Sequence, residues 1–228
     1  MSSLSRLFLC ALVLCALPLC AGPSLAAQPF YNPDEKTKAA LQQASEAYKA
    51  KDYEQTKKIL KPLADKNDPM ATFVMGLLAA RGAGQKQDFR AAESWWKKSA
   101  DAGNPLSQFH LGLLYFQGVL GAPDFVRTRA LWTKAAASRS PEALYGLGLL
   151  QKNGQGGSKD LAGAVKNFQD AAGMGNPLAA YELGQFYQNG QGGVKKDLKK
   201  AKELFAQAAD KGVSEARAAL DALNAAGK

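Results

Sequence analysis

His110 is the only histidine in this chain of 228 residues, so catalysis by an imidazole base would have to use it. A serine–histidine–aspartate triad also needs a nucleophile on a sharp turn, and the sequence has no Gly-x-Ser-x-Gly motif and no strand pattern to hold one. In the internal repeats described below, the residues equivalent to His110 are Val74, Gly146 and Glu182. Because these residues differ in chemistry, we predict an exposed or groove position for His110. Since no motif for a nucleophile accompanies it, we predict no catalytic residue and a protein that is not an enzyme.

Residues 154–159, Gly-Gln-Gly-Gly-Ser-Lys, contain the residue types of a phosphate-binding loop without its spacing. Such a loop has four residues between its glycines and then Gly-Lys followed by Ser or Thr. Similar glycines return in residues 190–193, which indicates a turn that belongs to a repeat. One histidine and three cysteines are also few ligands for zinc. We therefore expect no nucleotide, no metal and no other cofactor.

The three cysteines, at positions 10, 15 and 20, lie in an N-terminal stretch that is typical of an export signal. Arg6 gives it a positive start, the apolar run that follows is too short to span a bilayer, and small residues precede the expected cleavage site. This pattern predicts a signal peptide over residues 1–26, cleaved after Ala26 or Ala27, and a linker over residues 27–33. The mature protein would be periplasmic or secreted, with no thiol and no transmembrane helix.

Cys20 leaves one alternative open, which is a lipid attached to this cysteine. Lipoprotein signals end in a small residue followed by Cys, whereas the bulky Leu19 precedes Cys20 here. A lipoprotein is therefore not the form that we expect.

The basic excess is spread along the chain, which has 29 Lys and Arg against 20 Asp and Glu and a formal net charge of +9. The densest cluster lies around the start of a predicted helix and comprises Lys195, Lys196, Lys199, Lys200 and Lys202. Positive charge at this end of a helix opposes the helix dipole. The cluster is either a solvated surface or a contact with an anionic envelope surface or an acidic partner. Nucleic acid is not an expected partner, because no nucleic-acid-binding motif accompanies the charge.

The chain contains an internal repeat of 36 residues, to which His110, the glycine-rich turns and the lysine cluster belong. Each copy opens with a capping residue followed by proline, the order that begins a helix, at Asp68, Asn104, Ser140 and Asn176. A glycine that ends this first helix recurs at Gly82, Gly118, Gly154 and Gly190. We predict repeats over residues 68–103, 104–139, 140–175 and 176–212. A helical hairpin over residues 34–67 would cap one end, and a helix within residues 213–228 would cap the other.

Each repeat also has a glycine inside its first helix and a large ring or small pair in its second. The glycines are Gly76, Gly112, Gly148 and Gly184, and the rings are Trp96, Trp132, Phe168 and Phe205. A glycine inside a helix costs about 1 kcal/mol relative to alanine, so its return indicates a neighbouring helix too close for a Cβ. The rings would fill the space between helices.

The first helix of the repeat and its turn have the pattern Ala-x-x-x-Leu-Gly-x-x-Tyr-x-x-Gly-x-Gly. The second helix follows with Asp-x-x-x-Ala, a ring and Ala-Ala-x-x-Gly. This combined pattern resembles the SEL-one-like repeat, a close relative of the tetratricopeptide repeat. The fourth copy carries it most fully, at Ala179, Leu183, Gly184, Tyr187, Gly190, Gly192, Asp197, Ala201, Phe205, Ala208, Ala209 and Gly212. The resemblance implies an all-α fold, a right-handed α/α solenoid of about five helix hairpins with a C-terminal capping helix. It also implies a scaffold or adaptor that binds another protein or peptide, often through a concave face lined by the first helices.

Aromatic residues three positions before each helix glycine are the candidates for that face: Phe73, Phe109, Tyr145 and Tyr181. By analogy with the tetratricopeptide register, they would border the concave face together with Leu113. If exposed, the rings would form a docking strip; alternatively, they pack between adjacent first helices. The alternative function is a cell-envelope hydrolase or a peptidoglycan-binding protein, which no residue pattern in the chain supports.

Overall fold

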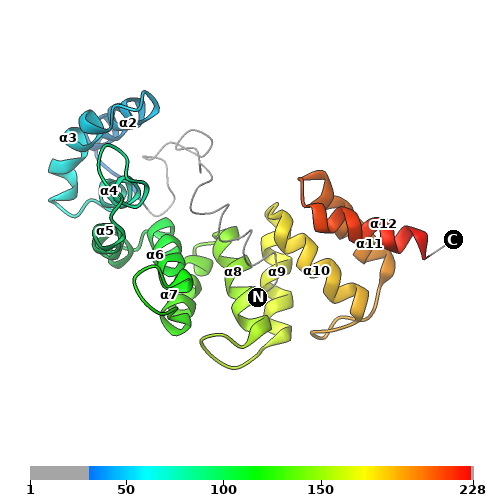
Figure 1. Ribbon diagram of the computed structural model, residues 1–228. Coiled ribbons are helices and arrows are strands. Elements are labelled where there is room, and N and C mark those ends of the chain that lie inside the picture. Colours follow the sequence, from blue (N-terminus) through cyan, green and yellow to red (C-terminus); the bar gives the residue numbers. More distant parts are fainter. Residues whose placement is uncertain (1–30, 227–228) are drawn as a thin grey trace. The chain divides into compact units, whose positions relative to one another are not determined.

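The computed structural model describes residues 31–226, which form eleven α-helices and no strand (Figure 1). The chain divides into two compact units, Met1–Pro123 and Asp124–Lys228. Unit 1 contains α2 (Glu35–Lys49), α3 (Tyr53–Ala64), α4 (Pro69–Arg81), α5 (Phe89–Asp101) and α6 (Pro105–Gln117). Unit 2 contains α7 (Phe125–Ala137), α8 (Pro141–Asn153), α9 (Leu161–Gly173), α10 (Pro177–Asn189), α11 (Leu198–Asp210) and α12 (Ser214–Ala225).

The first helix of each repeat begins and ends at the residues that the sequence predicts. In α4, the Asp68 carboxylate accepts hydrogen bonds from the backbone N–H groups of Met70 and Ala71, at 3.0 and 2.9 Å. The helix stops at Gly82, whose φ of 65° lies in the left-handed region that glycine adopts without strain. The other three first helices also start at a proline and end at a left-handed glycine. The all-helical architecture of repeated hairpins is therefore confirmed.

Three of the four helix glycines, Gly76, Gly148 and Gly184, lie directly beneath the large rings of the second helices. A Cβ added to Gly148 would lie 2.6 Å from Cε1 of Phe168, and one added to Gly184 would lie 2.6 Å from Cε1 of Phe205. At Gly76 the same atom would lie 2.4 Å from the Trp96 indole. Real Cβ atoms do not approach so closely, so the predicted close approach is confirmed. Each of these three glycines allows the two helices of its own repeat to pack through a ring.

Asn104 connects adjacent first helices within unit 1. It is fully buried, and its side-chain oxygen caps α6 by accepting from the backbone N–H groups of Leu106 and Ser107, at 2.9 and 3.3 Å. Its amide nitrogen donates to the carbonyl oxygen of Pro69 at the start of α4, at 3.0 Å. In unit 2, Asn176 makes the equivalent bond to the carbonyl of Pro141, at 3.5 Å. One side chain therefore both starts a repeat and bonds it to the repeat before.

The capping elements also follow the sequence expectation. The helices α2 and α3 are capped by Asp34 and Asp52, whose side chains accept from Thr37 and Gln55. The last helix, α12, lies within residues 213–228 as predicted. The predicted signal peptide and residues 27–30 of the predicted linker lie outside the described residues. Among residues 31–226, no helix is long and apolar enough to cross a membrane.

Candidate functional site

The four rings proposed as a docking strip lie in the core of their units, with exposed fractions between 2% and 8%. The ring of Tyr145 packs on Phe168 and that of Tyr181 on Phe205, with centroids 5.9 and 5.7 Å apart. Burial raises the pKa of the Tyr145 hydroxyl. The idea of an exposed strip is therefore wrong for Phe73, Phe109, Tyr145 and Tyr181. The alternative, packing between adjacent first helices, holds for Phe73, which contacts His110, whereas Tyr145 and Tyr181 pack on second-helix rings of their own repeats. The physical reason is that each first helix is buried on more than one side.

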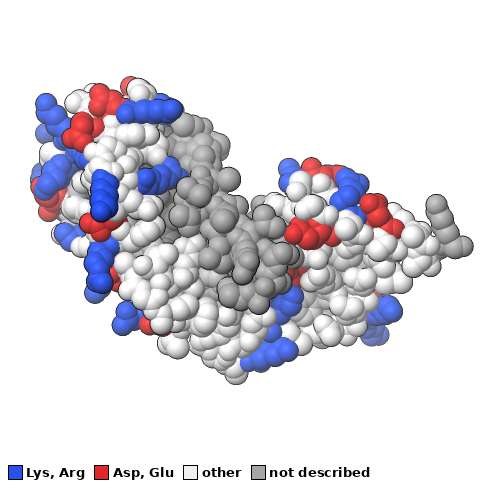
Figure 2. All heavy atoms as spheres, in the orientation of Figure 1, with Lys and Arg blue, Asp and Glu red and all other residues white. Residues whose placement is uncertain are grey.

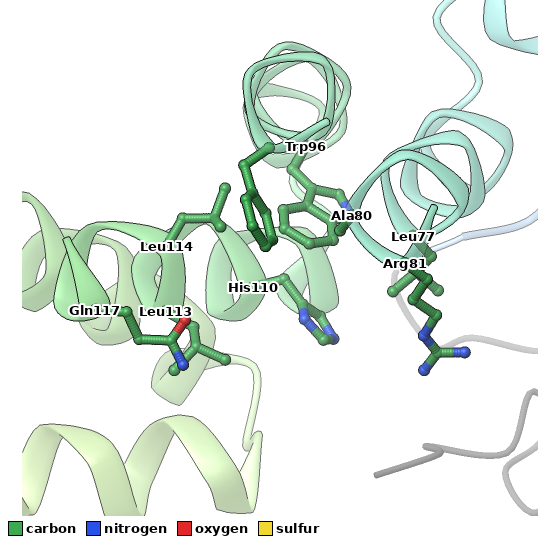
Figure 3. A pocket seen from close by; sticks show the side chains of 9 residues that line it. Leu77, Ala80, Arg81, Trp96, His110, Leu113, Leu114 and Gln117 are labelled. Atoms are coloured by element: carbon green, nitrogen blue, oxygen red, sulfur yellow. The ribbon is translucent and has the colours of Figure 1, made fainter. Parts of the chain in front are cut away.

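Leu113, the fifth candidate, is also buried but lines a pocket in unit 1 between α4, α5 and α6 (Figure 3). The empty volume of the pocket, including its part open to solvent, is about 400 Å³. Its wall is mostly apolar and comprises Leu77, Ala80, Phe89, Trp96, Leu113 and Leu114. Three polar side chains complete it, namely Arg81 from α4 and His110 and Gln117 from α6. Figure 3 shows all three extending away from α5.

His110 lines this pocket with 7% of its surface exposed, so of the two predicted positions, exposed or in a groove, the exposed one is wrong. Its imidazole packs against the rings of Phe73, Trp96 and Phe109, with centroid distances of 5.6, 5.1 and 5.6 Å. The Nε2 atom is shielded from solvent and has no hydrogen-bond partner in the described structure. Burial, together with the charge of Arg81, lowers the His110 pKa to about 4. The imidazole is therefore neutral at pH 7, and among the described residues its Nε2 has no serine hydroxyl as a partner, which a catalytic triad requires.

Arg81 supplies the positive charge of the pocket. It is half-buried in the last turn of α4, where a cation interacts favourably with the helix dipole. Its guanidinium donates a hydrogen bond to the hydroxyl of Tyr48 in α2. It forms no ion pair with any of the described residues. The sequence analysis did not select Arg81, although it is the single charge in an otherwise apolar helix.

Unit 2 has a different arrangement at the equivalent position. Glu182 is the sixth residue of α10, as His110 is the sixth residue of α6. The Glu182 carboxylate is buried and accepts a hydrogen bond from Nζ of Lys152, at 2.6 Å. Lys152 comes from the last turn of α8, the first helix of the preceding repeat. This position can therefore hold a carboxylate beside a cation from the neighbouring first helix.

The lysine cluster lies at the surface of unit 2 around the start of α11. Lys195, Lys196, Lys199 and Lys200 are all exposed, and Lys200 pairs with Glu203 at 3.3 Å. In Figure 2, basic side chains on the face in view are interspersed with acidic and uncharged ones. Contact of this cluster with an anionic surface stays a prediction. No group of three or more His, Cys, Asp or Glu suited to a metal ion occurs within residues 31–226.

Comparison with known proteins identifies the repeat. The Sel1 repeat family matches residues 69–104, 105–140, 141–176 and 177–213, which together make up more than half of the chain. The chain belongs to the Sel1-repeat family. Each of the four matched segments begins and ends one residue after the predicted repeat, and the SEL-one-like resemblance is confirmed.

Solved structures of other Sel1-repeat proteins have the same fold. The chain is similar to a Sel1 repeat protein from Oxalobacter formigenes, with 32% sequence identity, a TM-score of 0.72 and coverage of 78% of this chain and 73% of that one. It is also similar to a protective antigen present in uropathogenic Escherichia coli strains that displays an SLR fold. That comparison gives 26% identity, a TM-score of 0.71 and coverage of 74% of this chain and 36% of the antigen. No curated protein matches the chain.

Sel1-repeat proteins generally mediate interactions between proteins, and the repeat scaffold is typically non-enzymatic. In this chain, the pocket of unit 1 combines polar side chains with an accessible space. A second pocket, in unit 2, is lined by Lys199 and Lys202 together with Leu198, Leu223 and Ala226. Of the predicted site residues, the structure brings only Leu113 to the pocket of unit 1, where it lies with His110 and Arg81.

Proposed function

We propose that this Sel1-repeat protein is an exported, non-enzymatic adaptor that binds another protein or a peptide on the first helices of its repeats. The observation that carries the proposal is the pocket of unit 1, where α4 and α6 present an apolar wall together with Arg81, His110 and Gln117. A family whose members generally mediate protein interactions supports this role.

Site-specific photo-crosslinking in the native cell tests the binding surface. A photoreactive residue replaces Gln117, which lies half-buried at the pocket, and in a matched control it replaces the exposed Lys97 on α5. We expect a protein adduct from position 117 that is absent from position 97. The same adducts from both positions, or no adduct from position 117 in a folded protein, would overturn the proposal.

Export rests on the signal predicted for residues 1–26 and is tested by the N-terminus of the protein recovered from its native cell. We expect a mature chain that begins at Ala27 or Gln28, found in the periplasm or the medium. An unprocessed chain in the cytoplasm would contradict export. A lipid on Cys20 would contradict the cleavage site but not export itself.

A further inference from the structure

The pocket of unit 1 contains a cation without an anion among the described residues. Arg81 is half-buried, and within residues 31–226 its one side-chain hydrogen bond goes to the hydroxyl of Tyr48. A partly buried cation gains most from an anionic partner, because such a partner compensates its charge as well as accepting its hydrogen bonds. The guanidinium also has further N–H donors beyond the one that Tyr48 accepts from.

A second, independent observation comes from His110. Its Nε2 is buried in the pocket wall without a hydrogen-bond partner, although a buried polar atom is normally satisfied. Three rings surround the imidazole, so the surrounding core offers it no polar group. A ligand oxygen in the pocket would provide the partner that the protein does not.

Unit 2 indicates which ligand chemistry suits this position. There the residue equivalent to His110 is Glu182, and its buried carboxylate pairs with Lys152 from the preceding first helix. In unit 1 a cation again comes from the last turn of the preceding first helix, but the carboxylate is replaced by an imidazole beside a pocket. At this position, unit 1 therefore lacks the carboxylate that pairs with the cation in unit 2.

We infer that the pocket of unit 1 binds a peptide carboxylate, which pairs with Arg81 and hydrogen-bonds His110 while an adjoining apolar group contacts Leu77, Leu113 and Leu114. The carboxylate is either the C-terminus of a peptide that ends in an apolar residue or an acidic side chain. This inference rests on the proposed function, since it names the chemistry of the partner at the same site.

The single histidine allows a direct test, because a protein without a histidine tag gives the imidazole signals of His110 alone. N-Acetyl-leucine is titrated into the histidine-labelled protein and followed by NMR, and N-acetyl-leucinamide, which lacks the charge, is the matched control. We expect a saturable shift of the His110 signals with a Kd on the order of millimolar for so small a ligand. The amide should bind about tenfold more weakly, and equal binding of the two would overturn the inference.

Two variants test the charge of the pocket. Arg81→Gln should weaken N-acetyl-leucine binding about tenfold, whereas Arg90→Gln, which removes an exposed charge from α5, should leave it unchanged. His110→Glu would reproduce the arrangement of Glu182 and should abolish binding, followed here through the ligand signals. Undiminished binding by either pocket variant would overturn the inference.

A measurement on the unaltered protein covers the case in which a pocket variant fails to fold. A bound carboxylate favours the protonated imidazole, so saturating N-acetyl-leucine should raise the His110 pKa by about half a pH unit or more. The amide should leave the pKa unchanged. An unchanged pKa with both compounds would contradict the inference.

Further ligands separate the sources of the carboxylate. The first is N-acetylglutamate α-amide, which has its carboxylate on the side chain. It should bind more tightly than N-acetyl-leucine if the partner uses an acidic side chain. It should bind less tightly if the partner uses its C-terminus. Tighter binding of inorganic phosphate would overturn the assignment to carboxylates. An adduct from position 117 without any carboxylate binding would refute this inference and leave the proposed function intact.

Discussion

At the scale of single residues, the position of His110 is buried in all four repeats, although its chemistry differs in each. Val74, Gly146 and Glu182 are buried like His110 itself. Each meets a different neighbour: Gly146 lies against the Trp132 ring, and Glu182 pairs with Lys152. The residue type therefore varies because the partner varies. Variation between repeats predicts an exposed position for His110, and this prediction fails because the buried position has a different partner in each repeat.

The buried imidazole should make the stability of the protein depend on pH. His110 has a folded pKa of about 4, whereas in the unfolded chain it titrates near its ordinary value of about 6.5. Between these values only the unfolded chain binds the proton, so stability falls as pH drops from about 6.5 to about 4. The lost free energy of unfolding is about 3 kcal/mol, at about 1.4 kcal/mol per pH unit.

Urea unfolding at pH 7 and pH 4.5 measures this effect when wild type is compared with His110→Leu. Leucine fills most of the same space and does not titrate. Between the two pH values, wild type should lose about 2–3 kcal/mol more than the variant. Equal losses would mean that His110 is not held in its neutral form.

At the scale of the helix, the ends of elements could be predicted from sequence and their exposed faces could not. Asp, Asn or Ser before proline supplies a cap, and glycine supplies the left-handed stop, so local chemistry fixed where α4, α6, α8 and α10 begin and end. The faces were ambiguous because ten of the thirteen residues of α4 are buried. Such a helix has no polar side from which the sequence could reveal a binding surface.

The contact between a helix glycine and a ring can be tested with Gly148→Ala. The new Cβ would overlap the Phe168 ring, so we expect a loss of about 1–3 kcal/mol in stability. The matched control is Gly173→Ala at the end of α9, where no atom lies within 4 Å of the added Cβ. That change should be neutral or should stabilise the helix by up to about 1 kcal/mol. Chemical denaturation measures both, and similar effects of the two changes would refute the packing argument.

The bond between adjacent first helices gives a second prediction at this scale. Asn104→Ala removes both the cap of α6 and the donor to the Pro69 carbonyl. We expect the free energy of unfolding to fall by about 2 kcal/mol. The matched control is Asp88→Ala, which removes a cap of α5 that accepts from two backbone N–H groups at 3.0 Å. Since the Asp88 carboxylate cannot donate a hydrogen bond to another repeat, this change should lower the free energy of unfolding by only about 1 kcal/mol. Equal losses in urea unfolding would show that the bond to Pro69 contributes nothing.

At the scale of the whole molecule, the 36-residue period predicted the succession of hairpins but not the division into two compact units. The division falls between Pro123 and Asp124, inside the repeat predicted over residues 104–139. Similarly, the pocket depends on side chains from three helices, α4, α5 and α6. A periodic pattern reports what the repeats share, whereas the pocket arises from Arg81 and His110, which the other repeats lack at these positions.

If the protein is exported and cleaved as proposed, its stability should not depend on disulfides. All three cysteines lie within residues 1–26, so the mature chain would have no thiol if cleavage follows Ala26 or Ala27. A reducing agent should therefore leave the melting temperature of the mature protein unchanged, as followed by circular dichroism. A Sel1-repeat protein stabilised by disulfides would serve as the positive control. A fall in melting temperature on reduction would show that a cysteine is retained.

The double role of Asn104 and Asn176 has a consequence for how such a chain can change in evolution. The side chain of each asparagine caps the first helix of its own repeat and donates a hydrogen bond to a carbonyl of the previous repeat. The rings that pack on Gly76, Gly148 and Gly184 likewise come from the same repeats as these glycines. A duplicated or deleted segment of 36 residues would thus bring or remove a complete set of its own contacts. The length of the protein can therefore change by whole repeats through single recombination events, without compensating substitutions elsewhere.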